Sequence, residues 1–465
     1  MKHYLCMTGL IIVLEFPGIL IGWTIEVLDN DRGVASSIET DEQDRPFIAY
    51  DYGPDYRILY KEGDQWLEVS PPDSSRGMAE LFDMEIEPGG EVHLAFNSPW
   101  DGYIWYDKWN GESWATEVVD EGYRPSLSLF SNGYPSLSYD ISGGFAFAEW
   151  NGTSWNIEPV DTSLVYTFSS SLAIDSEGNP RFSYYGAETG QGWLLKYASR
   201  DSTGWYIETV DDRGIDRGYM NSLALDSNDN PHIAYIAWFW EVDWDSLEVW
   251  YTWKEGNEWQ IEVVDKWDGI EPLGWHWEGQ ISLALDASDV PHISYRNEDR
   301  LYFGRRDPGT GEWVREMIDP TAGTGRYTSL AIDSQGYPHI SYSANIAQGL
   351  RYATQRPTSI GNDNPNSTSM PKSFSLSQNF PNPFNPLTTI EITIPGNVSG
   401  LTELQIFDVR GRRIRTLQKG ELPPGQYRFV WDGRDDRGET VNSGIYLYSL
   451  KSGTEAITRK MTLLR

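Results

Sequence analysis

Four histidines recur at one position of a repeated sequence, and they are the residues that come nearest to a metal site. They are His93, His232, His292 and His339. A zinc ion would need its ligands within about 2.1 Å, whereas equivalent positions in neighbouring repeats are expected to lie on the order of 10 Å apart. Three further repeats carry Phe47, Ser136 and Arg181 at this position. We therefore predict structural roles for the histidines and no metal site.

Four aspartates share a second repeated position, and their spacing raises the question of calcium. They are Asp175, Asp226, Asp286 and Asp333. The run Asp226-x-Asn228-x-Asn230 is similar to the start of a calcium loop, but the closing bidentate Glu is missing. An Asp just before a Pro-led strand caps a tight turn through its own backbone. We predict turn capping and no cofactor, since nothing in the sequence supports a structural calcium ion.

Motifs of familiar catalytic sites are absent. The chain has no Gly-Lys-Ser/Thr phosphate loop, no His-Glu-x-x-His, no Gly-x-Ser-x-Gly and no Ser-x-Asp-x-Gly-x-Thr-Trp box. A glycosidase needs two carboxylates roughly 5 to 10 Å apart, but 69 acidic residues offer too many candidate pairs. No catalytic residue is predicted.

The elements that carry these positions are seven copies of one unit. The copies span residues 37–50, 83–96, 126–139, 171–184, 222–235, 282–295 and 329–342. A Trp-led run follows six of them, at Trp66, Trp114, Trp155, Trp205, Trp259 and Trp313, and a seventh run at Trp23 precedes the first. Spacings of roughly 41 to 60 residues with four strands each are typical of propeller blades. We predict an all-β, seven-bladed β-propeller over residues 22–355, closed by its N-terminal strand so that no sheet edge is left open.

Two hairpin motifs connect these repeats to known sequences. Residues Trp109–Trp114 and Trp150–Trp155 read Trp-Asn-Gly-x-Ser-Trp. In this respect the repeats resemble those of secreted bacterial propellers.

Aromatic residues crowd two long insertions, Ile236–Leu247 and Lys266–Gly279, which we expect to be irregular loops on one face of the disc. These insertions carry Trp238, Trp240, Trp244, Trp267, Trp275 and Trp277, and Trp100, Tyr103, Tyr52 and Tyr56 are expected on the same face. Flat aromatic rings that stack on sugars, beside carboxylates that accept hydroxyl hydrogen bonds, are typical of carbohydrate sites. The alternative is that these rings cover one another and hold the loops in place. Ligand binding by the tryptophans is a hypothesis at this stage.

Charge divides the chain into two parts. The formal net charge is −33, but the residues from Pro371 onward carry 13 basic and 9 acidic side chains, which leaves −37 on the first 370 residues. A chain this acidic lacks the basic surface that nucleic acid or an anionic membrane requires.

The N-terminus indicates export. Met1–His3 precedes an apolar run over residues 4–14, which Glu15 and Pro17 interrupt. This pattern predicts a cleaved signal peptide over residues 1–21 and no stable membrane span in the mature chain. Cys6, within that run, is the single cysteine, so no disulfide is expected.

A polar linker over residues 356–372 leads to a C-terminal domain over residues 373–465, whose alternating strands and Asp-Gly turns predict a small Ig-like β-sandwich. Its motifs are Asn-x-Pro-Asn-Pro at 379–383, Asp-x-x-Gly-Arg at 408–412, Ser-Gly-x-Tyr at 443–446 and Lys-Met-x-Leu-x-Arg at 460–465. These blocks resemble the type A C-terminal sorting domain of the type IX secretion system. The resemblance implies export by that machinery, then surface attachment or release, with the signal carried by Gly411, Arg412, Gly444, Tyr446, Lys460 and Arg465.

The regular units favour a secreted or cell-surface binding module that recognises a glycan or a protein. The alternative is a polysaccharide-active enzyme, a glycoside hydrolase or lyase, on the same propeller. A scaffold for protein partners is a third hypothesis. A fold alone does not decide between them.

Overall fold

A computed structural model describes residues 10–12, 23–29, 32–52, 55–63, 65–69, 82–98, 101–190, 192–213, 217–241, 244–267, 281–344, 349–355, 374–376, 379, 388–395, 401–421, 425–431, 433–437, 440–453 and 455–464. They form two compact units, one built mainly from residues 25–354 and the other mainly from residues 355–465. Among the described residues, no helix is long and apolar enough to cross a membrane.

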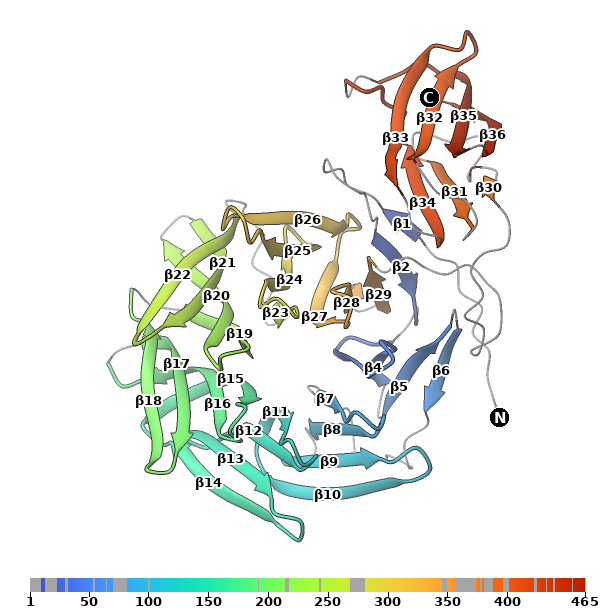
Figure 1. Cartoon of the computed structure of the whole chain (residues 1–465). Coiled ribbons are helices and arrows are strands. Elements are labelled where there is room, and N and C mark those ends of the chain that lie inside the picture. Colours follow the sequence, from blue (N-terminus) through green and yellow to red (C-terminus); the bar gives the residue numbers. More distant parts are fainter. Residues whose placement is uncertain are drawn as a thin grey trace. The chain divides into compact units, whose positions relative to one another are not determined.

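The first unit is a ring of seven antiparallel sheets, as predicted (Figure 1). Blade one is β3 (Ser36–Thr40), β4 (Pro46–Tyr52), β5 (Asp55–Glu62) and β6 (Gln65–Val69); blade two is β7 (Phe82–Ile86), β8 (Val92–Asn97), β9 (Tyr103–Trp109) and β10 (Trp114–Glu121); blade three is β11 (Tyr123–Leu129), β12 (Pro135–Ile141), β13 (Gly144–Trp150) and β14 (Trp155–Asp161). Blade four contains β15 (Leu164–Ile174), β16 (Pro180–Glu188), β17 (Gly192–Asp201) and β18 (Gly204–Asp211). Blade five contains β19 (Arg217–Leu225), β20 (Pro231–Glu241), β21 (Trp244–Glu255) and β22 (Glu258–Trp267). Blade six contains β23 (Ile281–Leu285), β24 (Pro291–Asn297), β25 (Arg300–Arg306) and β26 (Trp313–Asp319).

The seventh blade combines the two ends of the propeller sequence. It contains β27 (Thr324–Ile332), β28 (Pro338–Ala344), β29 (Leu350–Thr354) and β2 (Trp23–Val27), and its sheet also includes β1 (Leu10–Ile12). The N–H of Leu28 donates to the carbonyl of Leu350 at 2.9 Å, and the side chain of Trp23 is buried. The predicted closure by the N-terminal strand is confirmed.

At five of the seven interfaces between blades, a serine of the repeated unit joins one blade to the next. Ser171 Oγ in blade four accepts a hydrogen bond from the backbone N–H of Leu223 in blade five, at 2.9 Å. Equivalent bonds to Leu172, Leu283, Leu330 and Ile38 involve Ser126, Ser222, Ser282 and Ser329, and Asp83 accepts from Leu127 in the same way. The recurrent Ser therefore satisfies an N–H that neighbouring strands leave unpaired.

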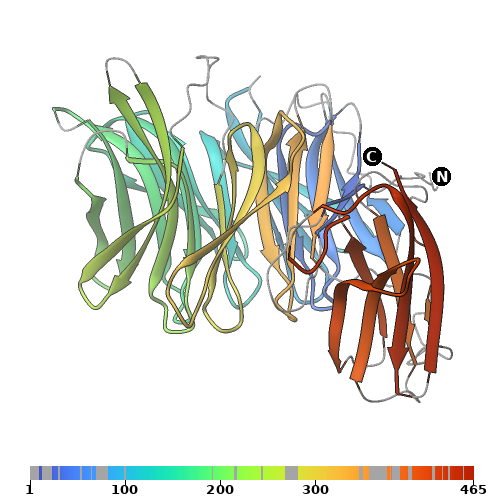
Figure 2. The ribbon, with the colours of Figure 1, turned by 90° about the horizontal axis from the view of Figure 1, so that it is seen from above.

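The strands run through the thickness of the disc (Figure 2), so the connections between strands collect on two opposite faces. Short turns between the first and second strands of each blade occupy one face. We call the other the loop-rich face: it carries the connections between the second and third strands and those between blades.

The second unit is a small two-sheet sandwich, as predicted. One sheet has β30 (Ser375–Leu376), β31 (Thr388–Ile394) and β34 (Gly425–Trp431); the other has β33 (Arg413–Glu421), β32 (Leu401–Asp408), β35 (Gly444–Ser452) and β36 (Glu455–Leu463). Trp431 from the first sheet and Tyr448 from the second lie in one buried core. Alternate burial along β32 and β35 follows from the two-residue period of a strand with one face in the core.

Candidate functional site

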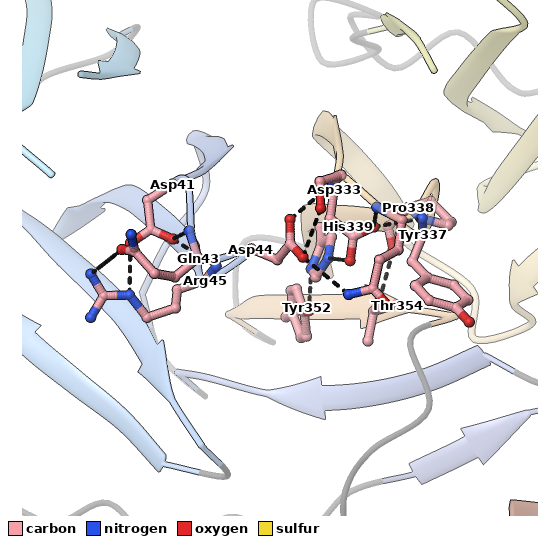
Figure 3. Close-up of polar contacts among 12 residues, drawn as sticks. Asp41, Gln43, Asp44, Arg45, Asp333, Tyr337, Pro338, His339, Tyr352 and Thr354 are labelled. Carbon is pink, nitrogen blue, oxygen red and sulfur yellow. Dashed lines mark hydrogen bonds and ion pairs between the residues drawn. The ribbon is translucent and has the colours of Figure 1, made fainter. Parts of the chain in front are cut away.

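The repeated histidines are structural, as predicted. His339 Nδ1 lies 2.6 Å from the hydroxyl of Tyr352, and its Nε2 lies 3.3 Å from Asp333 of the adjacent turn (Figure 3). His93 has equivalent partners in Tyr106 and Glu87. Burial lowers the pKa of His93, which keeps the imidazole neutral at neutral pH. In both of these histidines each ring nitrogen lies within hydrogen-bond distance of a protein group, whereas Nδ1 of buried His292, which lies beside Phe303, has no hydrogen-bond partner among the described residues.

The repeated aspartates cap the turns between first and second strands, also as predicted. Asp226 Oδ1 accepts from the backbone N–H groups of Asn228 and Asn230, each at 2.8 Å. The same pattern recurs at Asp175, Asp286 and Asp333. We call the interface between blade seven and blade one the seam. There, Asp44 of blade one reaches the turn of blade seven and accepts a hydrogen bond from the backbone N–H of Ser334 at 2.9 Å (Figure 3).

One group of metal-ligand type occurs among the described residues, at Glu87, Glu91 and His93. The ammonium of Lys108 lies 2.9 Å from Glu87 and 2.6 Å from Glu91. A cation of the protein itself is therefore paired with both carboxylates of this group.

Three acidic residues line the innermost strands of blades one and two. Burial, helped by nearby Asp83, raises the pKa of Glu39 to about 8. Burial and the charges of Glu39 and Asp83 raise the pKa of Glu85 well above its usual value. At neutral pH Glu39 is therefore mostly protonated, and a protonated carboxyl is a poor ligand for a cation.

The tryptophans of the outer strand pack between blades, as predicted. The ring of Trp313 lies edge-on to Tyr251 of the preceding blade with centroids 5.3 Å apart, and its Nε1 donates to Glu262 at 2.8 Å. Trp66 and Trp155 donate in the same way to Glu26 and Glu117.

The insertion Ile236–Leu247, expected to be an irregular loop, is instead a strand hairpin. β20 continues to Glu241 and β21 begins at Trp244, with Trp238 opposite Leu247 and Trp240 opposite Asp245. Aromatic and β-branched residues have high strand propensity, and a two-residue connection suits a hairpin. The prediction of a loop was wrong because acidic residues in this segment resemble loop composition.

The predicted ligand-binding tryptophans are placed only in part. The backbones of Trp238, Trp240, Trp244 and Trp267 are in strands, while their side chains, together with Trp100, Trp275 and Trp277, lie outside the described residues. The register sets Trp238, Leu247 and Trp267 in one cross-strand row. Their role as ligand contacts stays a prediction.

Five aromatic rings in blades four and five form a continuous series, which we call the aromatic ladder: Tyr166, Trp193, Tyr185, Tyr219 and Phe168. Tyr166 stacks on Trp193 with centroids 6.1 Å apart, and Trp193 stacks on Tyr185 at 4.6 Å. Tyr185 meets Tyr219 edge-on at 5.9 Å, and Tyr219 stacks on Phe168 at 5.0 Å. Stacked and edge-on contacts of this kind stabilise aromatic pairs beyond their buried area.

Long strands position this ladder on the loop-rich face. β15 has 11 residues where β3 has 5, and the pairing of Tyr166 with Ala187 and of Ala187 with Trp193 lies in the extension. Leu247, from the extended hairpin of blade five, packs against the same cluster. The ladder therefore adjoins the row that contains Trp238 and Trp267.

Exposure distinguishes the two parts of the ladder. Tyr185 and Tyr219 are buried, whereas Tyr166 is 64% exposed and Trp193 is partly exposed. Two more tyrosines at the same face are accessible: Tyr103 at 37% and Tyr123 at 51%. The described part of the loop-rich face thus carries accessible aromatic rings, one of them backed by a stack.

The other two tyrosines expected on this face are structural. Tyr56 is buried and its hydroxyl donates to Asp107 at 2.6 Å. The guanidinium of Arg57 lies 3.4 Å from the centre of the Tyr52 ring. Neither ring face is open to a sugar in the way that Tyr166 is.

In the sandwich, the predicted sorting residues lie at turns and strand ends. Gly411 has φ +76, and Asp408 accepts from Arg412 Nε at 3.1 Å across the same turn. The hydroxyl of Tyr446 donates to the carbonyl of Asn442 at 2.7 Å, a corner typical of Ig-like folds. Gly444 begins β35, Lys460 lies in β36, and Arg465 lies outside the described residues.

Comparison with known proteins matches the sandwich to one family. Residues 386–456 match the FlgD Ig-like domain. The basal-body rod modification protein FlgD of Salmonella typhimurium and that of Salmonella typhi are each 37% identical over 59 residues, which is 12% of this chain. The chain spans about a quarter of the length of these curated relatives, since the match covers 25% of each.

Similar solved structures are β-rich proteins with little sequence identity. PorZ, a surface component of the type IX secretion system of Porphyromonas gingivalis, is 10% identical with a TM-score of 0.36, over 95% of this chain and 74% of that one. SapL1 lectin with α-methyl fucoside is 13% identical with a TM-score of 0.43, over 63% and 99%. A PL25 ulvan lyase is 12% identical with a TM-score of 0.49, over 70% and 94%. Nothing about a ligand or an activity follows from likeness at this level.

Sequence reasoning missed the ladder. The residue after the Tyr of each repeated unit is polar in blades one to three, at Asp51, Asn97 and Asp140, but it is Tyr185 in blade four. An aromatic residue at this position, together with Trp193 outside the repeated Trp position, is the signal that could have found it.

Proposed function

We propose that the propeller is a secreted or cell-surface carbohydrate-binding module whose site includes the exposed end of the aromatic ladder. The observation that carries this proposal is Tyr166, which is 64% exposed and stacked on Trp193. Single exposed apolar residues are common on proteins. Tyr166 stacks on Trp193, which itself stacks on buried Tyr185, and a ring supported in this way is preorganised, so stacking on a sugar costs little conformational entropy.

Exposed rings nearby extend the site over neighbouring blades. Tyr103 begins β9 and Tyr123 begins β11, so accessible tyrosines follow the loop-rich face from blade two to blade four. Spaced aromatic platforms of this kind suit successive rings of a polysaccharide rather than one small molecule. The predicted positions Trp238 and Trp267 would continue this surface into blade five.

A matched pair of variants tests the proposal. Tyr166→Ala removes the exposed end of the ladder, and Tyr206→Ala removes a tyrosine of the same blade that is 59% exposed but lies in outer strand β18. On a glycan array, Tyr166→Ala should weaken binding about 5- to 10-fold, the value of one stacking contact. Tyr206→Ala should bind like the wild type. Equal binding by both variants would rule out the ladder as the site.

A polysaccharide-active enzyme on the same scaffold would be revealed in the same incubations. New reducing or unsaturated chain ends, formed by wild-type protein from a bound polysaccharide, would identify a hydrolase or a lyase. Unchanged polymer with saturable binding supports a binding module.

We also propose that the C-terminal sandwich directs export through the type IX secretion system. The supporting observation is the set of motifs at 408–412, 443–446 and 460–465. The first forms a turn capped by Asp408, and the second begins strand β35. Removing residues 373–465 should retain the folded propeller inside a bacterium that has this system. Unchanged release of the truncated protein would disprove a sorting role.

A further inference from the structure

Three blades carry a non-glycine residue in a left-handed conformation at the same place. Arg124, Met220 and Tyr327 have φ of 53°, 49° and 48°. Each lies two residues before the interblade serine of its innermost strand, where the strand pairing shifts register. Such a conformation costs about 1 kcal/mol or more for a residue other than glycine. Glycine would adopt this conformation without the cost. The side chains of these three residues therefore contribute something that glycine could not.

The strands that carry these positions, β11, β19 and β27, are the innermost strands of their blades and surround the centre of the ring (Figure 1). The burial of Tyr219 raises its pKa, Tyr327 raises it further, and Arg124 lowers it. Groups from blades three, five and seven are therefore close enough to act on one another. We call Arg124, Tyr219 and Tyr327 the axial mouth.

Arg124 connects the axial mouth to the aromatic ladder. Its guanidinium lies 4.5 Å from the centre of the Phe168 ring, and Phe168 stacks on Tyr219. A cation over an aromatic face is held in a defined orientation. The side chain is 35% exposed, so one edge of this oriented guanidinium is accessible to solvent.

The counter-charge of Arg124 is incomplete. Its Nη1 lies 2.6 Å from Asp140 Oδ2, and the Asp140 carboxyl, which is buried, also has the side chain of Thr167 as a hydrogen-bond partner. Burial raises the pKa of Asp140 to about 7, despite the lowering effect of Arg124. Near neutral pH, Asp140 is ionised only part of the time, so Arg124 retains positive charge for a further anion.

We propose that the ligand of the loop-rich face is an anionic carbohydrate, whose carboxylate or sulfate binds Arg124 while its sugar rings stack on the ladder. This inference rests on the proposed function and names the substrate class. Arginine is suited to the role because its planar donors match both anions with two parallel hydrogen bonds. The net charge of −37 on the first 370 residues does not prevent it. At physiological salt, charges beyond about 8 Å are largely screened, so contacting groups dominate.

Affinity electrophoresis tests the inference with charged and neutral polymers in parallel. The probes are polygalacturonate, alginate and dextran sulfate, with fully methyl-esterified pectin and dextran as neutral counterparts. The wild type should be retarded by at least one charged polymer. Arg124→Gln should bind it about 10-fold or more weakly, as expected for one charge-assisted contact. Binding of the neutral polymers should not differ between the two proteins.

A second variant controls for folding, because Arg124→Gln leaves buried Asp140 without its partner. Arg124→Gly combined with Asp140→Asn removes both charges and relieves the left-handed strain. It should keep the wild-type thermal midpoint and still lose the charged polymer. Full retention of that polymer by this double variant would overturn the inference.

The outcomes separate the two proposals. If Tyr166→Ala weakens binding of a neutral polymer and Arg124→Gln changes nothing, the anionic ligand is wrong and the ladder site stands. The same holds if the wild type binds neutral polymers and none of the charged ones. If the wild type binds no polymer of either kind, both proposals fail.

Discussion

Ser329 Oγ in the last blade accepts a hydrogen bond from the N–H of Ile38 in the first, at 3.2 Å, and so joins residues 291 positions apart. The bond from Leu283 to Ser222 between blades five and six is the same contact at 3.0 Å. The seam of the ring is therefore built like its internal interfaces. Closure therefore combines two contacts: strand β2 completes blade seven, and the last copy of the repeated unit meets the first as neighbouring copies meet elsewhere in the ring.

Replacing the seam serine should destabilise the propeller. Ser329→Ala leaves the Ile38 N–H without its acceptor, and we expect a loss of about 1 to 2 kcal/mol in the free energy of unfolding. Urea unfolding followed by tryptophan fluorescence measures it, since 20 of the 21 Trp precede Pro371. Ser128→Ala is the control, because four other blades carry Ala at that position: Ala173, Ala224, Ala284 and Ala331. Equal midpoints for the two variants would contradict the role of the serine.

Alanine substitutions at two glycines distinguish the stability cost of backbone strain from the cost of a close contact with a neighbouring blade. Gly325 and Gly336 both have φ +83, but a Cβ on Gly325 would lie 2.9 Å from Leu301 Cα, whereas none of the surrounding atoms is within 4 Å at Gly336. Gly336→Ala should cost about 1 kcal/mol of stability through strain alone. Gly325→Ala should cost about 3 kcal/mol or more, because the backbone of blade six must move. Thermal unfolding of both variants checks this, and similar losses would show that the close approach is not limiting.

The repeat made the ring predictable. The unit occurs seven times, and one Trp-led strand precedes the first unit instead of following the last. This order predicts a closed ring of blades, and the structure has that ring. The roles of His339 and Asp226 also followed from position, because a residue that recurs at the same place in several blades serves the blade. The Ser of the unit was visible too, but its acceptor role needs the neighbouring strand, which is supplied only by the assembled ring.

The candidate site was less predictable because it departs from the repeat. Trp193 and Tyr166 belong to extensions of blade four that lie outside the repeated unit, and their stacking depends on strand length and register. The segment 236–247 has acidic residues in its strands, Glu241 at the end of β20 and Asp245 near the start of β21. Composition there resembles a loop, so the sequence alone led to the wrong element.

Metal addition and removal should leave the wild type unchanged. EDTA or zinc should shift the thermal midpoint by less than about 1 °C, because a metal stabilises only what it binds. Lys108→Ala should behave differently: it uncovers Glu87, Glu91 and His93, whose ligand atoms all lie within 4.8 Å of one another. This variant should gain a zinc-dependent rise in the midpoint that EDTA reverses. A zinc response of equal size in the wild type would show that Lys108 does not occupy the site.

The stability of the propeller should depend on pH through Glu39. Its pKa is about 8 in the folded chain, against an ordinary value of 4.5, chiefly because of burial. The folded state therefore keeps a proton that the unfolded state releases, and this residue destabilises the fold progressively as the pH rises from about 4.5 to 8. Glu39→Ala, which introduces the residue of four other blades, should be more stable than the wild type by on the order of 2 kcal/mol at pH 8, with the difference vanishing near pH 4.5. Urea unfolding at pH 5, 6.5 and 8 measures this trend, with the exposed Glu42→Ala as control. A stability difference between Glu39→Ala and the wild type that stays constant across this range would exclude the buried carboxyl as its cause.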